Sequence, residues 1–372
     1  MKLIRCNVKK KIGKSKRISK VNLDFIVYSR TMNSDDFQRV KSLLSTPKRI
    51  GIVTHRNPDG DAFGSSLALS FYLKKLGHQV DVVSPNDCPG FLKWMPGEKE
   101  IVIFEHDINR ASSILERCEV VFVLDFNALH RLGDVMGEFM EALEPVYVMI
   151  DHHQEPDDFA DFTYVDPEIC STSQMVYQFM DELGDLDLLD TDIATCLYTG
   201  ILTDTGSFRF PATDSRTHRI VADLLDHGAR NSEIYSKIHD VNTYDRLQLL
   251  SRALHNLVVL KSFKTAYITL SQNELNRHNF QRGDTEGFVN YALSLKNVIF
   301  AAIFIEDKKQ KIIKISFRSA GSFSVNEFAR KHFNGGGHIN AAGGRSELSL
   351  KDTVKKFREL LIKYDEELKA SE

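Results

Sequence analysis

From residue 49 onward, apolar and polar positions follow two different patterns. Short apolar runs rich in β-branched residues predict buried strands, and longer segments with apolar residues three or four positions apart predict helices. Strands that alternate with helices pair in parallel through right-handed crossovers, which predicts a doubly wound, mainly parallel α/β sheet. The predicted strands are Arg49–Thr54, Val80–Ser84, Ile101–Phe104, Val120–Leu124 and Val146–Ile150, and the helices are Ala62–Leu76, Asn109–Arg117 and Gly133–Leu143.

The pattern of apolar positions changes after about residue 183. Helical spacing dominates there before a second group of short strands begins. We therefore predict a second, smaller α/β domain that faces the first across a cleft. The expected division is a basic extension over 1–31, a first domain over 32–240, a connecting helix over 241–257 and a second domain over 258–372. The helices predicted here are Asp192–Leu202, Thr217–Asp226, Thr243–Leu257, Val325–Lys331 and Lys351–Leu368, and the strands are Thr265–Leu270, Ile299–Ile305 and Ile312–Phe317.

The composition narrows the class of protein. With 42% hydrophobic and 27% charged residues, the chain of 372 residues is neither wholly disordered nor a disulfide scaffold, and its length fits two ordinary domains. No apolar run approaches the length of about 20 residues that a membrane-spanning helix requires. Five scattered cysteines without a CxxC pair indicate a reducing compartment and argue against a zinc–thiolate site. We expect a cytoplasmic protein that has no membrane partner.

The net charge of −3 conceals an asymmetry. Residues 1–31 carry ten Lys and Arg and a single acidic residue, Asp24, whereas the remaining residues carry 38 basic and 50 acidic side chains. Three interpretations of the basic block stay open: a start upstream of a native one at Met32, a solvated tail, or an arm that attracts RNA. The acidic remainder favours small substrates in a local pocket, because long nucleic acids need an extended basic track.

Clusters of polar residues follow four of the predicted elements. A single Asp after a strand is typically the N-cap of the next helix, and a single His there is more often an ordinary loop residue than a ligand. Together, however, the four clusters hold at least five Asp and three His. So many like charges at one sheet edge repel one another unless cations lie between them. The clusters are His55–Asp61, Asp125, Asp151–His153 and Asp204.

The types of side chain indicate which cations these are. Carboxylates and imidazoles without a thiolate favour Mn²⁺ or Mg²⁺. Six ligands are too many for one catalytic ion with open positions, but they suit two ions about 3.5–4 Å apart, an arrangement that promotes phosphoryl displacement. We therefore predict two divalent ions, Mn²⁺ first and Mg²⁺ as the alternative. The candidate ligands are His55, Asp59, Asp61, Asp125, His152 and Asp204.

The order of these residues resembles a known family, the DHH phosphoesterase superfamily. The second half of the chain resembles the DHHA1 substrate-binding domain of that superfamily, through Phe317–Ser319 and the glycine-rich run from Phe333 to Gly344. The resemblance covers most of the chain, from about Arg49 to the C-terminus, and is far more specific than a lone Asp-His-His. The segments that resemble motifs I to IV are His55-x3-Asp59-x-Asp61, Asp125, Asp151-His152-His153 and Asp204.

The resemblance implies a role for each of these positions. Asp151 is expected to fix the ring of a histidine from behind, and His153 to face the substrate phosphate and donate a proton to the leaving oxygen. The ring nitrogen through which each histidine binds stays open. The implied ligand sets are His55, Asp59 and Asp125 for one ion and Asp61, His152 and Asp204 for the other, with Asp125 bridging the two.

The second domain is expected to hold the substrate. Three consecutive glycines let backbone N–H groups approach a phosphate closely, although such a run alone is more often a flexible loop. Arg318 and His338 would add charge-assisted hydrogen bonds. The candidate substrate-binding residues are Arg318, Ser319, Gly335, Gly336, Gly337, His338 and, five residues after Asp204, Arg209.

Within the superfamily, the compact two-domain chain resembles the nanoRNase/pAp-phosphatase (NrnA) group. This resemblance implies hydrolysis of short oligoribonucleotides to mononucleotides and removal of the 3′-phosphate of adenosine 3′,5′-bisphosphate (pAp). A phosphodiesterase of cyclic or linear dinucleotides (c-di-AMP or pApA) is the alternative, and a non-catalytic nucleotide-binding module is a distant one. The expected partners are short RNA or small nucleotides, and not long duplex nucleic acid. Whether the chain forms a homodimer stays open.

Overall fold

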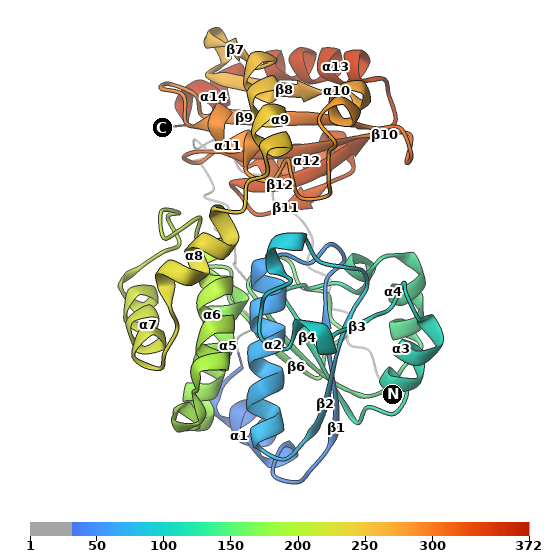
Figure 1. The fold of residues 1–372 in the computed structure, drawn as a ribbon, viewed down its shortest axis with the longest axis vertical. Helices are drawn as coiled ribbons and strands as arrows, with labels where there is room; N and C mark the ends of the chain where they lie inside the picture. The colour runs from blue at the N-terminus through green and yellow to red at the C-terminus, as the bar shows by residue number, and fades with distance from the viewer. Residues whose placement is uncertain (1–31, 372) are drawn as a thin grey trace, which may run out of the picture.

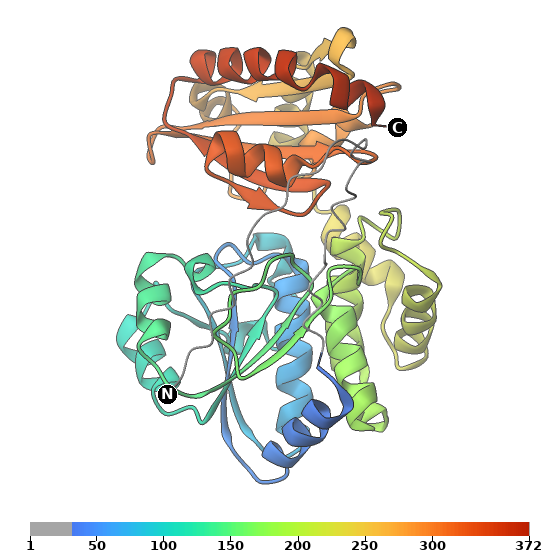
Figure 2. The same cartoon turned by 180° about the vertical axis from the view of Figure 1, so that it is seen from behind.

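The chain folds into two domains, each built on one β-sheet with helices on both faces (Figures 1 and 2). The computed structural model describes residues 32–371, so the basic segment 1–31 lies outside the described residues. A short linker over residues 240–243 leads from the first domain to the second. The two-domain α/β fold predicted from the sequence is confirmed.

The sheet of the first domain is parallel throughout. Its strand order, β3-β2-β1-β4-β5-β6, reverses direction at β1 and β4. In sheets of this kind, ligands bind at the carboxyl ends of the strands beside such a reversal. The strands are β1 (Arg49–Thr54), β2 (Gln79–Ser84), β3 (Val102–Ile103), β4 (Val120–Leu124), β5 (Val146–Asp151) and β6 (Phe162–Val165).

Two separate apolar cores cover this sheet. Ile50 and Ile52 of β1 point to the core under α1, α2, α5 and α6, whereas Val53 points to the core under α3 and α4. This alternation follows from the two-residue period of a strand. The helices are α1 (Ser34–Leu43), α2 (Gly60–Lys75), α3 (Ile108–Leu115), α4 (Asp134–Glu141), α5 (Thr172–Leu183), α6 (Thr191–Asp204), α7 (Ser215–Asp226) and α8 (Asn231–His239).

Helices α2 and α6 cross closely because glycines face each other where they meet. A Cβ atom at Gly64 would lie 2.6 Å from the carbonyl oxygen of Cys196 and 2.9 Å from the backbone nitrogen of Gly200. A Cβ atom at Gly200 would lie 1.9 Å from Oγ of Ser173. Since these neighbours are backbone or buried atoms, only glycine allows this separation, and the close crossing brings the first turn of α2 near the last turn of α6.

The second domain is built on a mixed sheet of order β11-β12-β10-β9-β8-β7, in which only the β8–β9 pair is parallel. Phenylalanines fill the core on one face; the ring centroid of Phe300 lies 4.9 Å from that of Phe323 and 5.1 Å from that of Phe328. The strands are β7 (Val258–Leu260), β8 (Thr265–Leu270), β9 (Phe300–Asp307), β10 (Ile312–Ser319), β11 (Gly336–Gly337) and β12 (Ala341–Ser346).

The connecting helix α9 packs on the second sheet. Leu249 and Ala253 of α9 are fully buried in a core with Ala266, Ile268 and Ala301. Helices α10 and α11 share this face, and α12, α13 and α14 cover the other. The helices are α9 (Tyr244–His255), α10 (Gln272–Arg277), α11 (Phe288–Leu293), α12 (Val325–Phe333), α13 (Leu350–Lys363) and α14 (Asp365–Ala370).

The structure departs from the sequence prediction in several places, and besides the elements named below, the helices α1, α8, α10 and α11 and the strands β7, β11 and β12 were not predicted. The segment Lys351–Leu368, predicted as one helix, forms α13 and α14, which are separated at Tyr364 by a non-helical backbone (φ −110°, ψ 11°). The strand predicted over Ile101–Phe104 pairs only over Val102–Ile103, because a turn of 3-10 helix ends directly before it at Glu100. The edge strand β6 and helix α5 were not predicted.

We expect the substitution Gly64→Ala to destabilise the first domain by about 1–3 kcal/mol, because the added methyl group overlaps the backbone of α6. Urea unfolding followed by circular dichroism measures this change. Gly90→Ala is the matched control, since a Cβ atom at Gly90 meets nothing within 4 Å; we expect it to change stability by less than about 0.5 kcal/mol. Equal midpoints for the two variants would contradict a tight helix crossing.

Candidate metal centre and substrate cleft

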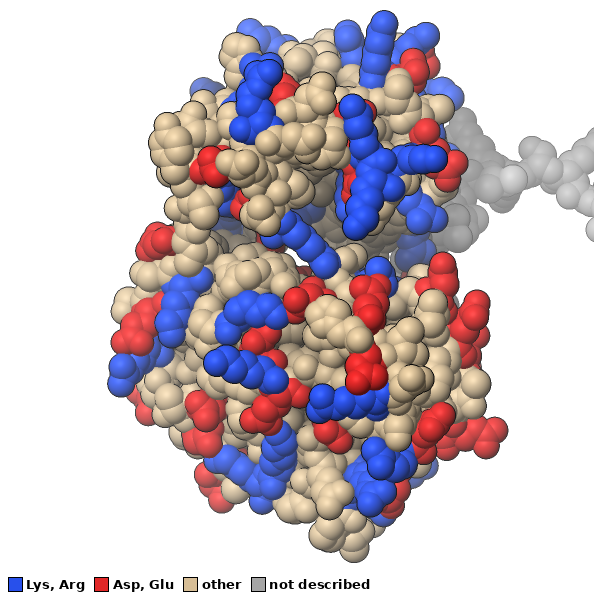
Figure 3. Space-filling model, turned by 45° about the vertical axis from the view of Figure 1, so that its right-hand side comes forward, with Lys and Arg blue, Asp and Glu red and all other residues tan. Residues whose placement is uncertain are grey.

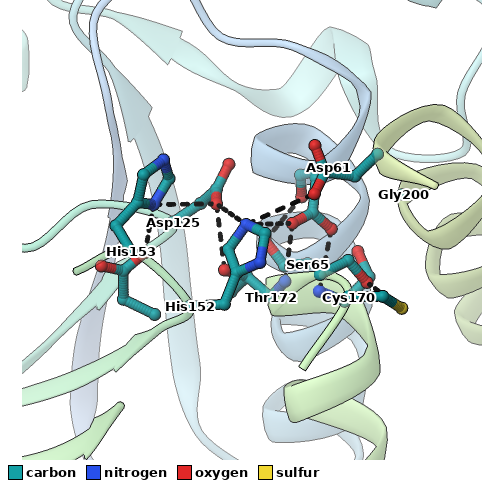
Figure 4. A network of polar contacts seen from close by, with 12 residues as sticks. Asp61, Ser65, Asp125, His152, His153, Cys170, Thr172 and Gly200 are labelled. Atoms are coloured by element: carbon teal, nitrogen blue, oxygen red, sulfur yellow. Dashed lines mark hydrogen bonds and ion pairs between the residues drawn. The ribbon is translucent and has the colours of Figure 1, made fainter. Parts of the chain in front are cut away.

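The six candidate ligands converge at the carboxyl ends of β1, β4 and β5. Figure 4 shows three of them, Asp61, Asp125 and His152, directed toward one another. His55 follows β1, Asp125 follows β4 and His152 follows β5, whereas Asp61 lies in the first turn of α2 and Asp204 ends α6. Ligand atoms of five of them form two overlapping groups, each within 4.8 Å, which share Asp125. The sixth, Asp204, has its Oδ2 3.4 Å from Nε2 of His152. The groups are His55, Asp59 and Asp125, and Asp61, Asp125 and His152.

Asp125 lies between the two groups. Its Oδ2 is 3.3 Å from Nε2 of His55, and its Oδ1 is 3.5 Å from Nε2 of His152. The residue has a left-handed backbone (φ 62°), and its N–H donates to the carbonyl oxygen of Ile150 at 3.2 Å. This unusual conformation, which Asp tolerates better than most residues, turns the side chain across the strand ends. One carboxylate can therefore serve both groups.

Backbone carbonyl groups set the orientation of both ligand histidines. Nδ1 of His55 lies 3.0 Å from the carbonyl oxygen of Arg56, and Nδ1 of His152 lies 3.1 Å from that of Ile169. Because a carbonyl oxygen only accepts hydrogen bonds, we assign the ring proton to Nδ1 in each case. Nε2 is then free to bind a cation, which answers the question that the sequence leaves open.

Helix α5, which was not predicted, fixes Asp61 and Asp125. The N–H groups of Thr172 and Ser173, in its first turn, donate to Oδ2 and Oδ1 of Asp61 at 2.6 and 2.8 Å. The hydroxyl group of Thr172 donates to Oδ1 of Asp125 at 3.0 Å (Figure 4). A helix N-terminus stabilises carboxylates in this way. The run Ser171-Thr172-Ser173 carries the polar pattern of an N-cap and was the available signal in the sequence.

The buried carboxylates strongly perturb one another. Burial, with the charges of Asp61 and Asp59, raises the pKa of Asp125 well above its usual value, and burial raises the pKa of Asp204 to about 7. Burial would lower the pKa of His152, but Asp204, Asp125 and Asp61 outweigh it and raise the pKa to about 9. Protons or cations must therefore offset this charge, and a divalent cation that binds would displace protons.

The donor set fits divalent metal ions. Oxygen and nitrogen donors without sulfur suit Mn²⁺ or Mg²⁺, and the two groups that share Asp125 offer two adjacent positions. A further acidic cluster, formed by Asp87, Cys88 and Glu98, lies elsewhere in the first domain. There the ammonium group of Lys93 pairs with Asp87 and lies 2.7 Å from Oε1 of Glu98, so a lysine already supplies the cation.

Asp151 and His153 form a pair beside the candidate metal centre. Nδ1 of His153 lies 2.7 Å from Oδ1 of the fully buried Asp151, so Asp151 fixes the ring of His153. Burial lowers the pKa of His153 to about 4. Burial would raise the pKa of Asp151, but its interactions with His153, which include a hydrogen bond, and with His152 and Arg131 outweigh burial and lower the pKa. The pair is therefore a neutral imidazole on a carboxylate.

The second domain reaches this centre with His338. Its ring stacks on that of His153, with centroids 4.3 Å apart and an angle of 23° between the planes, and lies 4.8 Å from the ring of His152. Burial lowers the pKa of His338 well below its usual value. Arg318 lies on β10 and pairs in register with Ala341 of β12, three residues after His338. Both residues were predicted to contact substrate.

Other predicted substrate contacts have different surroundings. The hydroxyl group of Ser319 donates to the carbonyl oxygen of Phe323 at 2.7 Å and accepts from Nδ2 of Asn340 at 2.9 Å, so it stabilises the turn after β10. Arg209 is exposed, and its guanidinium group lies over the ring of Phe210 at 5.4 Å. The structure places neither side chain in the group around Asp125.

The three consecutive glycines form a strand edge rather than an open loop. Gly336 and Gly337 make up β11 and pair with Gly343 and Ala342 of β12. A Cβ atom at Gly335 would lie 1.9 Å from the carbonyl oxygen of Gly343. The N–H of Gly337 already donates to Oδ1 of Asn326, so not every N–H group of the run is free for a phosphate. Close backbone packing therefore accounts for Gly335 and Gly337, and phosphate binding there stays a prediction.

The fold and the site define a class of protein: a two-domain α/β protein with a candidate centre for divalent cations at the edge of a parallel sheet, faced by His338 of the second domain. Across the described residues, helices are too short or too polar to cross a membrane.

Comparison with known proteins gives the family. The chain matches the DHH family, N-terminal domain, over residues 49–201 and the DHHA1 domain over residues 261–369. It is 33% identical to the bifunctional oligoribonuclease and PAP phosphatase NrnA of Thermus thermophilus, over 79% of this chain and 83% of that one. The crystal structure of an exopolyphosphatase-related protein from Bacteroides fragilis is similar, with a TM-score of 0.86 and 39% identity, over 90% of this chain and 97% of that one.

A further relative is the cyclic-di-AMP phosphodiesterase GdpP of Geobacillus thermodenitrificans, which is 25% identical over 88% of this chain but only 49% of that protein. The chain belongs to the DHH family of metal-dependent phosphoesterases and carries a DHHA1 domain.

We expect Mn²⁺ at about 100 times its dissociation constant to stabilise the protein by about 2.7 kcal/mol, since the ion binds only the assembled site. The substitution Asp125→Asn should abolish this gain. The variant should not be less stable than the parent without added metal, because it removes one of the mutually repelling carboxylates. Thermal unfolding with and without Mn²⁺ measures both effects. Asp87→Asn, in the cluster that contains Lys93, is the control and should retain the gain; an unchanged gain in Asp125→Asn would refute the assignment.

Proposed function

We propose that the protein is a two-metal phosphoesterase that hydrolyses short oligoribonucleotides to mononucleotides and removes the 3′-phosphate of pAp. The observation that carries this proposal is the geometry of Asp125, whose two oxygens face two different histidines, 3.3 and 3.5 Å away. The name of the Thermus thermophilus relative supports the choice of substrates. Mn²⁺ is the proposed ion, with Mg²⁺ as the alternative, because both prefer oxygen and imidazole donors.

Two cations held by the groups that share Asp125 would supply charge neutralisation at a phosphate and activation of a water molecule. The residues of the chain itself hold the candidate ligands and orient them. Thr172 and Ser173 lock Asp61, while the carbonyl oxygens of Arg56 and Ile169 fix His55 and His152 with Nε2 directed inward. Such preorganised donors need no rearrangement when charge develops on the phosphate, which lowers the barrier.

His153 is placed to donate a proton to the leaving oxygen of the substrate. Asp151 holds Nδ1 of His153, so its Nε2 is the atom available to the substrate. In the free protein the imidazole is neutral, because burial lowers its pKa to about 4. The charge of a bound phosphate favours the protonated ring, and Nε2 can then donate a proton to the leaving oxygen. Arg318 and His338 approach from the second domain and would bind the phosphate oxygens.

A second candidate activity is hydrolysis of cyclic or linear dinucleotides. The similarity to the cyclic-di-AMP phosphodiesterase GdpP favours it, since 88% of this chain takes part in that match. The two candidates use the same centre and differ in which nucleotide the second domain accepts.

The proposal is tested by release of phosphate or mononucleotide from pAp, a five-nucleotide RNA, a linear dinucleotide and c-di-AMP. We expect turnover of pAp and the short RNA that requires Mn²⁺, and we expect Asp125→Ala to abolish it, because the substitution removes a ligand common to both groups. Asp87→Ala should keep full activity. Preferential turnover of c-di-AMP would establish the second candidate, and nucleotide binding without any turnover would indicate a non-catalytic module.

We expect His338→Ala to raise KM for pAp by about tenfold while it leaves the content of bound Mn²⁺ unchanged, because His338 would contact the substrate rather than the ions. Steady-state kinetics and elemental analysis of the purified protein separate these effects. His255→Ala, an exposed histidine at the end of α9, is the matched control and should alter neither quantity. Loss of Mn²⁺ from the His338 variant would instead make this residue a metal ligand.

A further inference from the structure

The second domain touches the first on both sides of the candidate metal centre. On one side, the guanidinium group of Arg330 in α12 pairs with Glu155, two residues after His153. On the other side, the guanidinium group of Arg282 donates to Oδ1 of Asn57. Figure 3 shows basic side chains of the second domain facing acidic ones of the first across this junction, where the surface is hollowed.

The contact at Asn57 is made by a loop of the second domain, residues 279–287, which we call the wall loop. It connects α10 to α11 and carries Arg282 near its middle. The next residue, Gly283, has a left-handed backbone (φ 101°), and a Cβ atom on it would lie 3.6 Å from Cβ of Pro89. The wall loop therefore lies against the first domain at two points, at Asn57 and beside Pro89.

Asn57 is held firmly on the first domain. Its N–H donates to Oδ1 of the buried Asn86 at 2.7 Å, and its backbone is left-handed (φ 60°). It stands two residues from each of two candidate ligands, His55 and Asp59. Arg282 thus binds a fixed point on the rim of the centre.

The wall loop is also braced against the connecting helix. Nη2 of Arg246 in α9 donates to the carbonyl oxygen of Glu286 at 2.9 Å, and Nδ2 of Asn279 donates to Oδ2 of Asp245 at 3.0 Å. A loop tied to α9 at both ends behaves as a wall rather than as a free flap.

We propose that the wall loop, through the contact of Arg282 with Asn57, closes one end of the substrate cleft and limits the length of strand that the protein accepts. The inference rests on the proposed function. On this proposal a pAp molecule or a dinucleotide lies between the two contacts, whereas a longer strand that crosses the centre must displace Arg282 or Arg330. The exposed position of the Arg282–Asn57 contact lets it open, at a free-energy cost that short substrates avoid.

The test compares the parent protein with Arg282→Ala on pAp, a dinucleotide and a twenty-nucleotide RNA. We expect the ratio of kcat/KM for the long RNA to that for the dinucleotide to rise at least about fivefold. Arg277→Ala, at the exposed end of α10, removes the same charge from the same domain and should leave the ratio unchanged. An unchanged or lower ratio in Arg282→Ala, or a parent protein that prefers the long RNA, would overturn the inference.

A binding measurement tests the role of the wall loop independently of turnover. It follows the fluorescence anisotropy of a labelled twenty-nucleotide RNA in the presence of EDTA. Loss of an arginine normally weakens RNA binding, because a phosphate contact disappears. If the wall loop limits strand length, the affinity changes in the opposite direction: Arg282→Ala should bind the RNA more tightly than the parent protein does. Equal or weaker binding counts against the inference. Failure of the parent to hydrolyse any substrate would refute the proposed function, and the sign of the binding change would still decide on the wall loop.

Discussion

Mutual repulsion among buried carboxylates is the constraint on which the rest of the first domain depends. Asp61 and Asp125 are almost completely buried and share His152 as a neighbour, with Asp204 on its other side. Burial in a medium of low dielectric makes such a group of like charges unfavourable unless positive charge lies among them. The arrangement is therefore typical of a site for multivalent cations, and it would be a poor way to stabilise a fold.

Ordinary packing holds these charges in place. The glycine contact between Gly64 and Gly200 sets the distance between α2 and α6, and thereby the distance between the ends that carry Asp61 and Asp204. The N-terminus of α5 then directs its N–H groups at Asp61. The left-handed backbone of Asp125 adds local strain, which the hydrogen bond to Ile150 helps to sustain. Precision at the site thus depends on the strand ends and on the helices α2, α5 and α6, which pack on one face of the sheet.

The sequence predicts two kinds of feature: elements with a regular apolar pattern, and clusters of polar residues that could act as ligands. Strands β1, β4 and β8 coincide with their predicted bounds because each is a largely apolar run. Most candidate ligands could be identified because they follow such a strand, and Asp204 because it ends an apolar helix. What the sequence did not reveal depends on contacts between distant residues. In the sequence, Thr172 resembles any residue near a helix N-terminus, and only the structure shows that its N–H group donates to Asp61. Likewise, Arg282 is one of many exposed arginines, and only the structure shows that it contacts Asn57.

The glycine-rich run shows why a motif and its physical reason must be kept apart. From the sequence, the glycines of this run indicate an open anion-binding loop. In the structure, Gly335 and Gly337 are required because neighbouring backbone atoms leave no room for a Cβ atom, and β11 pairs with β12. The consequence for function is indirect but strong: the tight hairpin carries His338 at its end and presses its ring onto His153. Glycine here would serve the site by placing a side chain from one domain against the histidines of the other.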